Sequence, residues 1–144
     1  MSFVEWNDEL SIGIPQVDGE HQNLVAILNL LDEAIQKGKG TRVMGEILTQ
    51  LVEYTAIHFE SEERLMSEAG YPDLEYHKRL HRQLVEKVEK FHLKFTVSGQ
   101  RISRVMMEFL KYWLSNHILV DDTAFGEFFV AQPQSEPEDT CVLV

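Results

Sequence analysis

Residues 74–95 read LEYHKRLHRQLVEKVEKFHLKF, and this stretch decides the fold class. Its apolar positions recur at steps that alternate between three and four residues, which is the repeat of a helix packed in a bundle. We expect this helix to start near Asp73 and to end at Ser98-Gly99. The stripe consists of Leu74, His77, His81, Leu84, Val88, Phe91 and Phe95. Two of its members are therefore histidines rather than apolar residues.

Three further segments show the same helical repeat. They are predicted from the N-cap Asp18 to Lys37, from the N-cap Thr41 to just before Gly70, and from about Gln100 to about Val120. Their inner stripes hold His21, Leu24, Leu28, Leu31 and Ile35; Ile47, Leu51, Tyr54, His58, Glu62 and Leu65; and Ile102, Met106, Phe109, Trp113 and His117. Four helices with short connections predict an all-α protein, an up-down-up-down antiparallel four-helix bundle.

The two ends of the chain differ from this helical pattern. Residues 1–17 contain Gly13 and Pro15 and are expected to form an irregular arm against the bundle. A short closing turn is expected around Phe125–Phe129. After Ala131 the sequence becomes rich in proline and acidic residues. We therefore predict a domain over residues 1–131 and a flexible acidic tail over residues 132–144.

Composition excludes several classes of protein. The chain has 144 residues, 24 acidic against 13 basic, a net charge of −11 and a single cysteine. The acidic balance argues against binding to nucleic acid, which needs a basic face. One cysteine rules out an internal disulfide and a cysteine-rich zinc site. No apolar run is long enough to span a membrane, and no signal peptide is visible, so we expect a cytoplasmic protein.

The histidines carry the functional signal. Five of the six lie on the predicted inner faces, beside a glutamate, and burying them without a common partner costs several kcal/mol each. Residues four apart on a helix lie on one face, so pairs at this spacing can reach one ion. Zinc tolerates nitrogen and oxygen donors without sulfur but usually takes four ligands, whereas seven candidates suit two ions bridged by carboxylates, and such bridges favour iron or manganese. The candidates are His21, His58, Glu62, His77, His81, His117 and an acid from Asp121-Asp122.

Helix geometry leaves the choice within this acidic pair open. On an unbroken α-helix, Asp121 lies about 40° around the axis from His117, whereas Asp122 lies about 140° away. Geometry alone therefore favours Asp121.

Taken in order, these motifs resemble the hemerythrin family, specifically its bacterial single-domain type. The resemblance covers about residues 4–130 and rests on VDGEH at 17–21, HFESEE at 58–63, Gly70-Tyr71-Pro72 ahead of His77 and His81, and residues 113–122. It implies that His77, His81 and His117 bind one iron ion and that His21 and His58 bind a second. Glu62 and Asp122 would bridge the two ions, along with an oxo or hydroxo group. The choice of Asp122 requires the helix to loosen just after His117.

The implied ligands leave one position open. Three nitrogens, two carboxylate oxygens and the bridge give the first iron six ligands, whereas the second has five. The resemblance implies that O₂ binds reversibly at this position, for storage, delivery or scavenging, and that the protein is not an enzyme. The family lines the O₂ pocket with bulky apolar residues, and the matching positions are Leu24, Phe59, Trp113, Leu114 and Ile118. Glu20 replaces the family's usual glutamine, which adds a negative charge beside His21 and alters redox behaviour.

Two other roles fit the same family. The domain could sense O₂ or redox state for a protein partner, or it could be a diiron enzyme acting on nitric oxide, peroxide or damaged iron–sulfur clusters. A ferritin-like site needs two Glu-x-x-His pairs, and this chain has only Glu89-x-x-His92, off the helical seam. His92 is therefore expected on the flank. Cys141–Val144 has the outline of a prenylation box, but its final valine is unusual, so a free thiol is expected.

Overall fold

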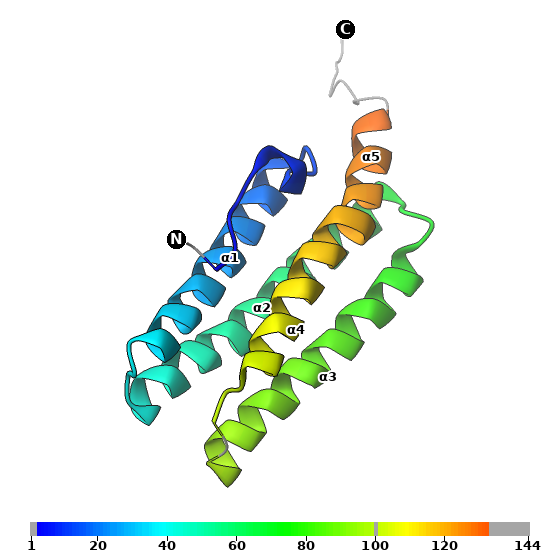
Figure 1. The fold of residues 1–144 in the computed structure, drawn as a ribbon. Helices are drawn as coiled ribbons and strands as arrows, with labels where there is room; N and C mark the ends of the chain where they lie inside the picture. Colours follow the sequence, from blue (N-terminus) through cyan, green and yellow to red (C-terminus); the bar gives the residue numbers. More distant parts are fainter. Residues whose placement is uncertain (1–2, 100, 133–144) are drawn as a thin grey trace, which may run out of the picture.

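The computed structural model describes residues 3–99 and 101–132 and shows an antiparallel bundle (Figure 1). Its helices are α1 (Pro15–Gln36), α2 (Thr41–Ala69), α3 (Leu74–Ser98), α4 (Arg104–Asn116) and α5 (Thr123–Ala131). A 3₁₀ turn, η1 (Asp8–Leu10), lies in the arm, and a π-helical turn, η2 (His117–Asp122), joins α4 to α5. No strand occurs in the described ranges. The all-α, up-down-up-down four-helix bundle predicted from the sequence is confirmed.

The start of α1 differs from the prediction. The helix begins at Pro15, because proline at the first helical position has a suitable φ angle and needs no backbone donor. Asp18 is thus a first-turn residue, and its prediction as the N-cap is wrong. Its carboxylate instead accepts hydrogen bonds from the Ile12 backbone N–H at 2.8 Å and the Ser11 hydroxyl at 2.6 Å. Asp18 therefore ties the N-terminal arm to the helix.

The other boundaries follow from local capping. Helix α2 ends before Gly70, whose φ of 71° and backbone hydrogen bonds to the last turn form a left-handed C-cap. Helix α4 starts at Arg104, later than the expected Gln100. The reason is Ser103, whose hydroxyl accepts a hydrogen bond from the Met106 backbone N–H at 3.1 Å. The sequence pattern thus located each long helix and misplaced some ends by a few residues.

The expected closing turn near Phe125 is instead helix α5. The backbone N–H of Thr123 donates to the carbonyl of Ile118, five residues earlier, which is the π-helical pattern. The Thr123 hydroxyl donates to the same carbonyl at 2.8 Å. Because the backbone stays in the right-handed helical region through this turn, the chain continues as a helix.

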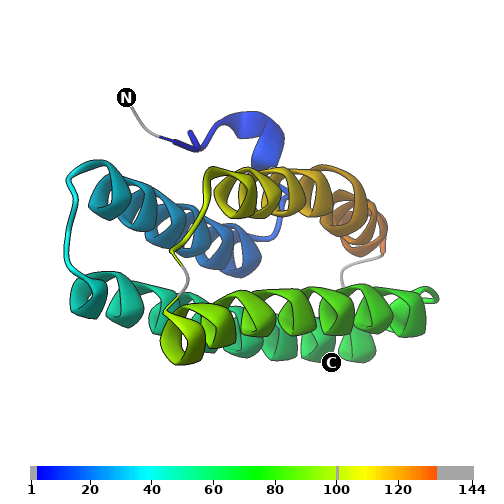
Figure 2. The same cartoon turned by 60° about the horizontal axis from the view of Figure 1, so that its bottom comes forward.

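The N-terminal arm packs across α1 and the α4–α5 rod (Figure 2). Asn29 on α1 exchanges two hydrogen bonds with the backbone of Val4, at 2.8 and 2.9 Å. On α5, Gly126 approaches Ile12 so closely that an added Cβ would clash with the Ile12 backbone. The arm is therefore part of the packed domain.

None of the helices in the described residues combines the length and apolar character needed to cross a lipid bilayer. Most of the predicted tail, 133–144 with Cys141, lies outside those residues.

Candidate metal centre

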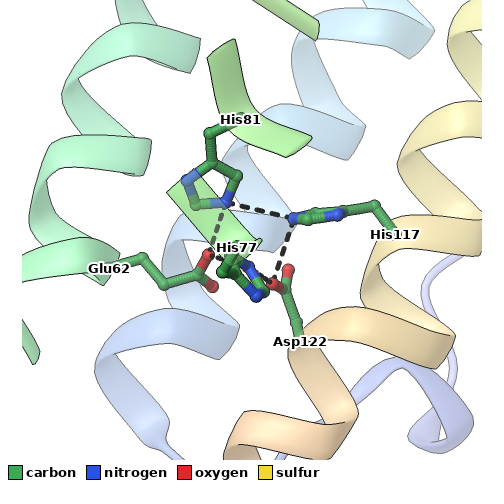
Figure 3. Close-up of side chains that lie close together, drawn as sticks. All are labelled: Glu62, His77, His81, His117 and Asp122. Carbon is green, nitrogen blue, oxygen red and sulfur yellow. Dashed lines mark hydrogen bonds and ion pairs between the residues drawn. The ribbon is translucent and has the colours of Figure 1, made fainter. Parts of the chain in front are cut away.

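The seven candidate ligands meet in the interior of the bundle, and each is at most 3% exposed. Their side-chain donor atoms form two groups. The first, shown in Figure 3, contains Glu62, His77, His81, His117 and Asp122, and the second contains His21, His58, Glu62 and Asp122. Helices α1, α2 and α3 and the turn η2 all contribute. Glu62 and Asp122 belong to both groups.

Glu62 turns a different oxygen toward each group. Its Oε1 lies 3.0 Å from His81 Nε2 and 3.2 Å from His77 Nε2. Its Oε2 lies 3.6 Å from His21 Nε2 and 3.9 Å from His58 Nε2. A carboxylate placed in this way can bridge two ions.

Asp122 divides its oxygens in the same manner. Its Oδ1 lies 2.9 Å from His77 Nε2 and 3.1 Å from His117 Nε2, whereas Oδ2 lies 3.0 Å from His21 Nε2. With metal–nitrogen bonds of about 2.1 Å, donors at right angles to one another lie about 3 Å apart. The spacing of these donors therefore fits a metal ion in the first group.

The histidine tautomers support the same conclusion. His81 donates its Nδ1–H to Glu63 at 2.8 Å, and His117 donates its Nδ1–H to Asp121 at 3.1 Å. A neutral imidazole has a single N–H, so Nε2 of each ring carries only a lone pair. These two Nε2 atoms lie 3.1 Å apart. Two facing lone pairs need a proton or a metal cation between them.

Several buried polar atoms have no hydrogen-bond partner of suitable geometry. They are both nitrogens of His21, His58 Nε2, both oxygens of Glu62 and Asp122 Oδ2. Each such atom costs about 1–3 kcal/mol when it is left unsatisfied. All but His21 Nδ1 face the shared interior, where metal ions would satisfy them.

The pKa values show that this interior demands positive charge. Burial alone would lower the pKa of His21 and His77, but the carboxylates of Asp122 and Glu62 raise both to about 9. Burial would also lower the pKa of His117, but Asp122 and Asp121 raise it to about 10. Burial opposes ionisation of Glu62 and Asp122, yet the surrounding imidazoles hold both carboxyl pKa values below normal. Without metal, protons supply the balancing charge.

A second layer of acids holds the histidines from outside. Besides the Glu63 and Asp121 contacts, Glu20 accepts a hydrogen bond from His58 Nδ1 at 2.6 Å. Histidines that bind metals commonly donate their other nitrogen to a carboxylate in this way. The sequence places Glu20 beside its neighbour His21. In the structure, the Glu20 carboxylate contacts His58 instead. The sequence reasoning missed Glu63, although its position beside Glu62 and near the inner face was a signal.

The π-helical turn decides the geometry of the two aspartates. Hydrogen bonds from residue i to i+5 widen the turn, which brings the fifth residue after His117 back to the inner face. Asp122 consequently points into the cluster, while Asp121 reaches the outer nitrogen of His117. The loosening of the helix after His117, which the resemblance required, is confirmed.

Aromatic rings cover two histidines of the first group, His81 and His117. Phe59 stacks on His81 with ring centroids 3.7 Å apart, and Trp113 stacks on His117 at 5.5 Å. Phe59 and Trp113 also meet edge to face at 5.7 Å. The other predicted pocket residues, Leu24, Leu114 and Ile118, are buried in the core. His92 lies apart, with its Nε2 3.0 Å from the Thr49 hydroxyl, as its flank position predicted.

The comparisons with known proteins agree with this geometry. The family model described as "Hemerythrin HHE cation binding domain" matches residues 12–128. A bacteriohemerythrin of Stenotrophomonas maltophilia is 39% identical over 127 residues, covering 88% of this chain and 82% of the relative. One from Clostridium acetobutylicum is 33% identical over 83% of this chain and 96% of its own length. A solved structure of wild-type hemerythrin is similar with a TM-score of 0.84 and 27% identity, covering 90% of this chain and all of that one.

Proposed function

Because this chain belongs to the hemerythrin family, we propose that it holds two non-haem iron ions and binds O₂ reversibly at one of them. The observation that carries the proposal is the pair of buried donor groups that share Glu62 and Asp122. Since each shared carboxylate presents a separate oxygen to each group, the donors suit two bridged ions rather than one.

We assign His77, His81 and His117 to one iron and His21 and His58 to the other, with Glu62 and Asp122 as bridges. The two donor groups support this division. The unequal number of histidines leaves the second iron with one ligand fewer. Imidazole and carboxylate donors without sulfur suit iron in such a pair.

The protein's own side chains hold the site and keep water away from it. When bound, the iron pair supplies the electrons and the open position that O₂ needs. We propose that Leu24, Leu114 and Ile118, together with Phe59 and Trp113, form the apolar O₂ pocket. Leu24, Phe59, Leu114 and Ile118 are buried and Trp113 is partly buried against the core, which supports this role because exclusion of water slows the side reactions of a bound oxidant.

We propose that the protein stores, delivers or scavenges O₂ and is not an enzyme. Besides the candidate ligands, the buried polar side chains among the described residues are Asp32 and Thr55. Threonine is a poor acid or base, and Asp32 lies eleven residues beyond His21 on α1. The acids beside the site, Glu20, Glu63 and Asp121, each accept a hydrogen bond from a candidate ligand histidine, so they hold the ligands rather than serve as free acid–base groups of the kind most catalysed steps need. A single cysteine fits the proposed cytoplasmic location, and the charge of −11 fits a protein that does not bind nucleic acid.

Iron analysis combined with absorption spectroscopy tests the function. We expect two iron ions per chain and a visible charge-transfer band that appears with O₂ and disappears when O₂ is removed. Irreversible oxidation with no reversible band would contradict reversible binding. Turnover of nitric oxide or peroxide faster than free iron would favour an enzyme. Hydrogen exchange that differs between oxygenated and reduced protein would favour a sensor.

A further inference from the structure

Glu20 on α1 reaches across to α2, and both of its carboxylate oxygens make hydrogen bonds. Oε1 accepts the Nδ1–H of His58 at 2.6 Å, the shortest of the three contacts between a histidine and an outer acid. Oε2 lies 3.1 Å from the Ser61 hydroxyl and 3.4 Å from Gln16 Nε2. Gln16 also donates to Ser61 at 3.1 Å. The side chain of Glu20 is 20% exposed, so its charge is held close to His58 and partly shielded from water.

The two histidines of the second group have different surroundings. Nδ1 of His58 donates to Glu20, whereas Nδ1 of His21 is buried without a hydrogen-bond partner. In the first group, His81 and His117 both have an outer acid. In the second group, the negative charge of Glu20 therefore acts directly on His58 and not on His21.

We propose that Glu20 is a positioning residue that holds His58 in the Nδ1–H tautomer and lowers the reduction potential of the ion bound by His21 and His58. The proposal rests on the diiron function proposed above. A charge-assisted hydrogen bond to Nδ1–H leaves the Nε2 lone pair facing the metal and makes it a stronger donor. A stronger donor stabilises the ferric more than the ferrous ion. Glu20 therefore favours electron transfer toward O₂ and tighter O₂ binding.

Glu20→Gln separates the charge from the hydrogen bond. The amide oxygen of glutamine can still accept from His58, and its amino group can face Ser61, whose hydroxyl is also an acceptor. Glu20→Ala removes both the charge and the hydrogen bond. Glu33→Gln is the matched control, because it removes the same charge from α1 at an exposed site where Glu33 pairs with Lys37, away from the cluster.

The decisive measurement is the reduction potential of the iron-loaded full chain. For Glu20→Gln we expect a rise equivalent to a tenfold change in the ferric-to-ferrous affinity ratio, about 59 mV for one electron. Glu33→Gln should leave the potential unchanged. Glu20→Ala should in addition weaken iron binding about 10–100-fold. Equal potentials in wild type and Glu20→Gln, or an equal shift in Glu33→Gln, would overturn the proposal.

Nitrogen NMR of metal-free protein gives a readout that needs no iron. We expect His58 to be the Nδ1–H tautomer in wild type and Glu20→Gln, and a mixture in Glu20→Ala. A mixture already in wild type would contradict the positioning role. The iron content and reversible O₂ band of the wild type are measured first. If they fail, the proposed function fails, whereas an unshifted potential in a protein that passes them overturns only the role of Glu20.

Discussion

At the scale of single residues, Glu62 and Asp122 join the two halves of the centre. Each is fully buried and turns one oxygen to each histidine group. A fully buried carboxylate is costly unless cations or hydrogen bonds compensate it. Here five imidazoles surround Glu62 and Asp122. The same histidines that would bind metal therefore also compensate the charge of the two carboxylates.

The first prediction compares histidines inside and outside this cluster. Replacing His81 or Glu62 with alanine should lower the iron content and the melting temperature together, because each change leaves other buried donors unpaired. His92→Ala is the control, since the His92 side chain hydrogen-bonds Thr49 outside the cluster and its loss should cost about 1 kcal/mol or less. Iron analysis and thermal unfolding check both effects. Full iron occupancy in His81→Ala would contradict the assignment.

The second prediction concerns the pH dependence of the metal-free protein. Burial alone would lower the pKa values of His21, His77 and His117. The carboxylates of Asp122 and Glu62 outweigh burial and raise the pKa of His21 and His77 to about 9 and that of His117 to about 10. A raised histidine pKa contributes stability that is complete below the unfolded value of about 6.5. This stability is lost progressively as pH rises from about 6.5 through 9–10, so the free energy of unfolding should fall over that whole range.

Urea unfolding of the metal-free protein from pH 6 to pH 10 measures this loss. In the iron-bound protein, the free energy of unfolding should instead rise with pH between about pH 6 and pH 7, because imidazole must lose its proton to bind metal. Iron affinity should therefore increase as pH rises toward 7 and above. A metal-free protein that gains stability between pH 7 and pH 10 would show that its histidines are not protonated in the folded state.

At the scale of elements, the turn η2 determines which aspartate enters the centre. An α-helix would place Asp121 nearer the inner face, and the π-helical turn replaces it with Asp122. The chain then continues as α5, and the widened turn has an additional hydrogen bond from a side chain. The Thr123 hydroxyl, 2.8 Å from the Ile118 carbonyl, supplies this bond and supports the turn.

The third prediction tests this support with Thr123→Val, which keeps the side-chain shape and removes the hydroxyl. The variant should lose about 0.5–1.5 kcal/mol of stability and bind iron up to about tenfold more weakly. Thr96→Val is the matched control, because Thr96 makes a similar bond to the His92 carbonyl on an exposed part of α3. Equal iron affinities for the two variants would mean that the hydroxyl does not hold the turn.

At the scale of the whole molecule, the N-terminal arm and α5 close the end of the bundle that holds the site. Gly126 allows this closure, because any Cβ there would meet the backbone and Cβ of Ile12. The arm is held independently by Asp18 and Asn29 on α1. The contact between arm and α5 therefore couples the first residues of the domain to the segment that follows Asp122.

The fourth prediction is that Gly126→Ala displaces the arm and destabilises the protein by about 1–3 kcal/mol. Gly19→Ala, within α1, is the control, because an added Cβ there meets nothing within 4 Å. It should be neutral or stabilising by up to about 1 kcal/mol, since alanine favours a helix more than glycine does. Denaturant unfolding of both variants measures the difference. Equal stabilities would show that the arm is not packed against α5.

The sequence by itself determined the four bundle helices and the set of inward donors, because helical periodicity depends only on residues three and four apart. Those local relations placed His58 with Glu62 and His77 with His81 on single faces. The tertiary structure decided between Asp121 and Asp122, paired Glu20 with His58 and turned each bridging oxygen to its own histidines. These outcomes depend on a widened backbone turn and on packing between helices distant in sequence, which no single-helix repeat contains.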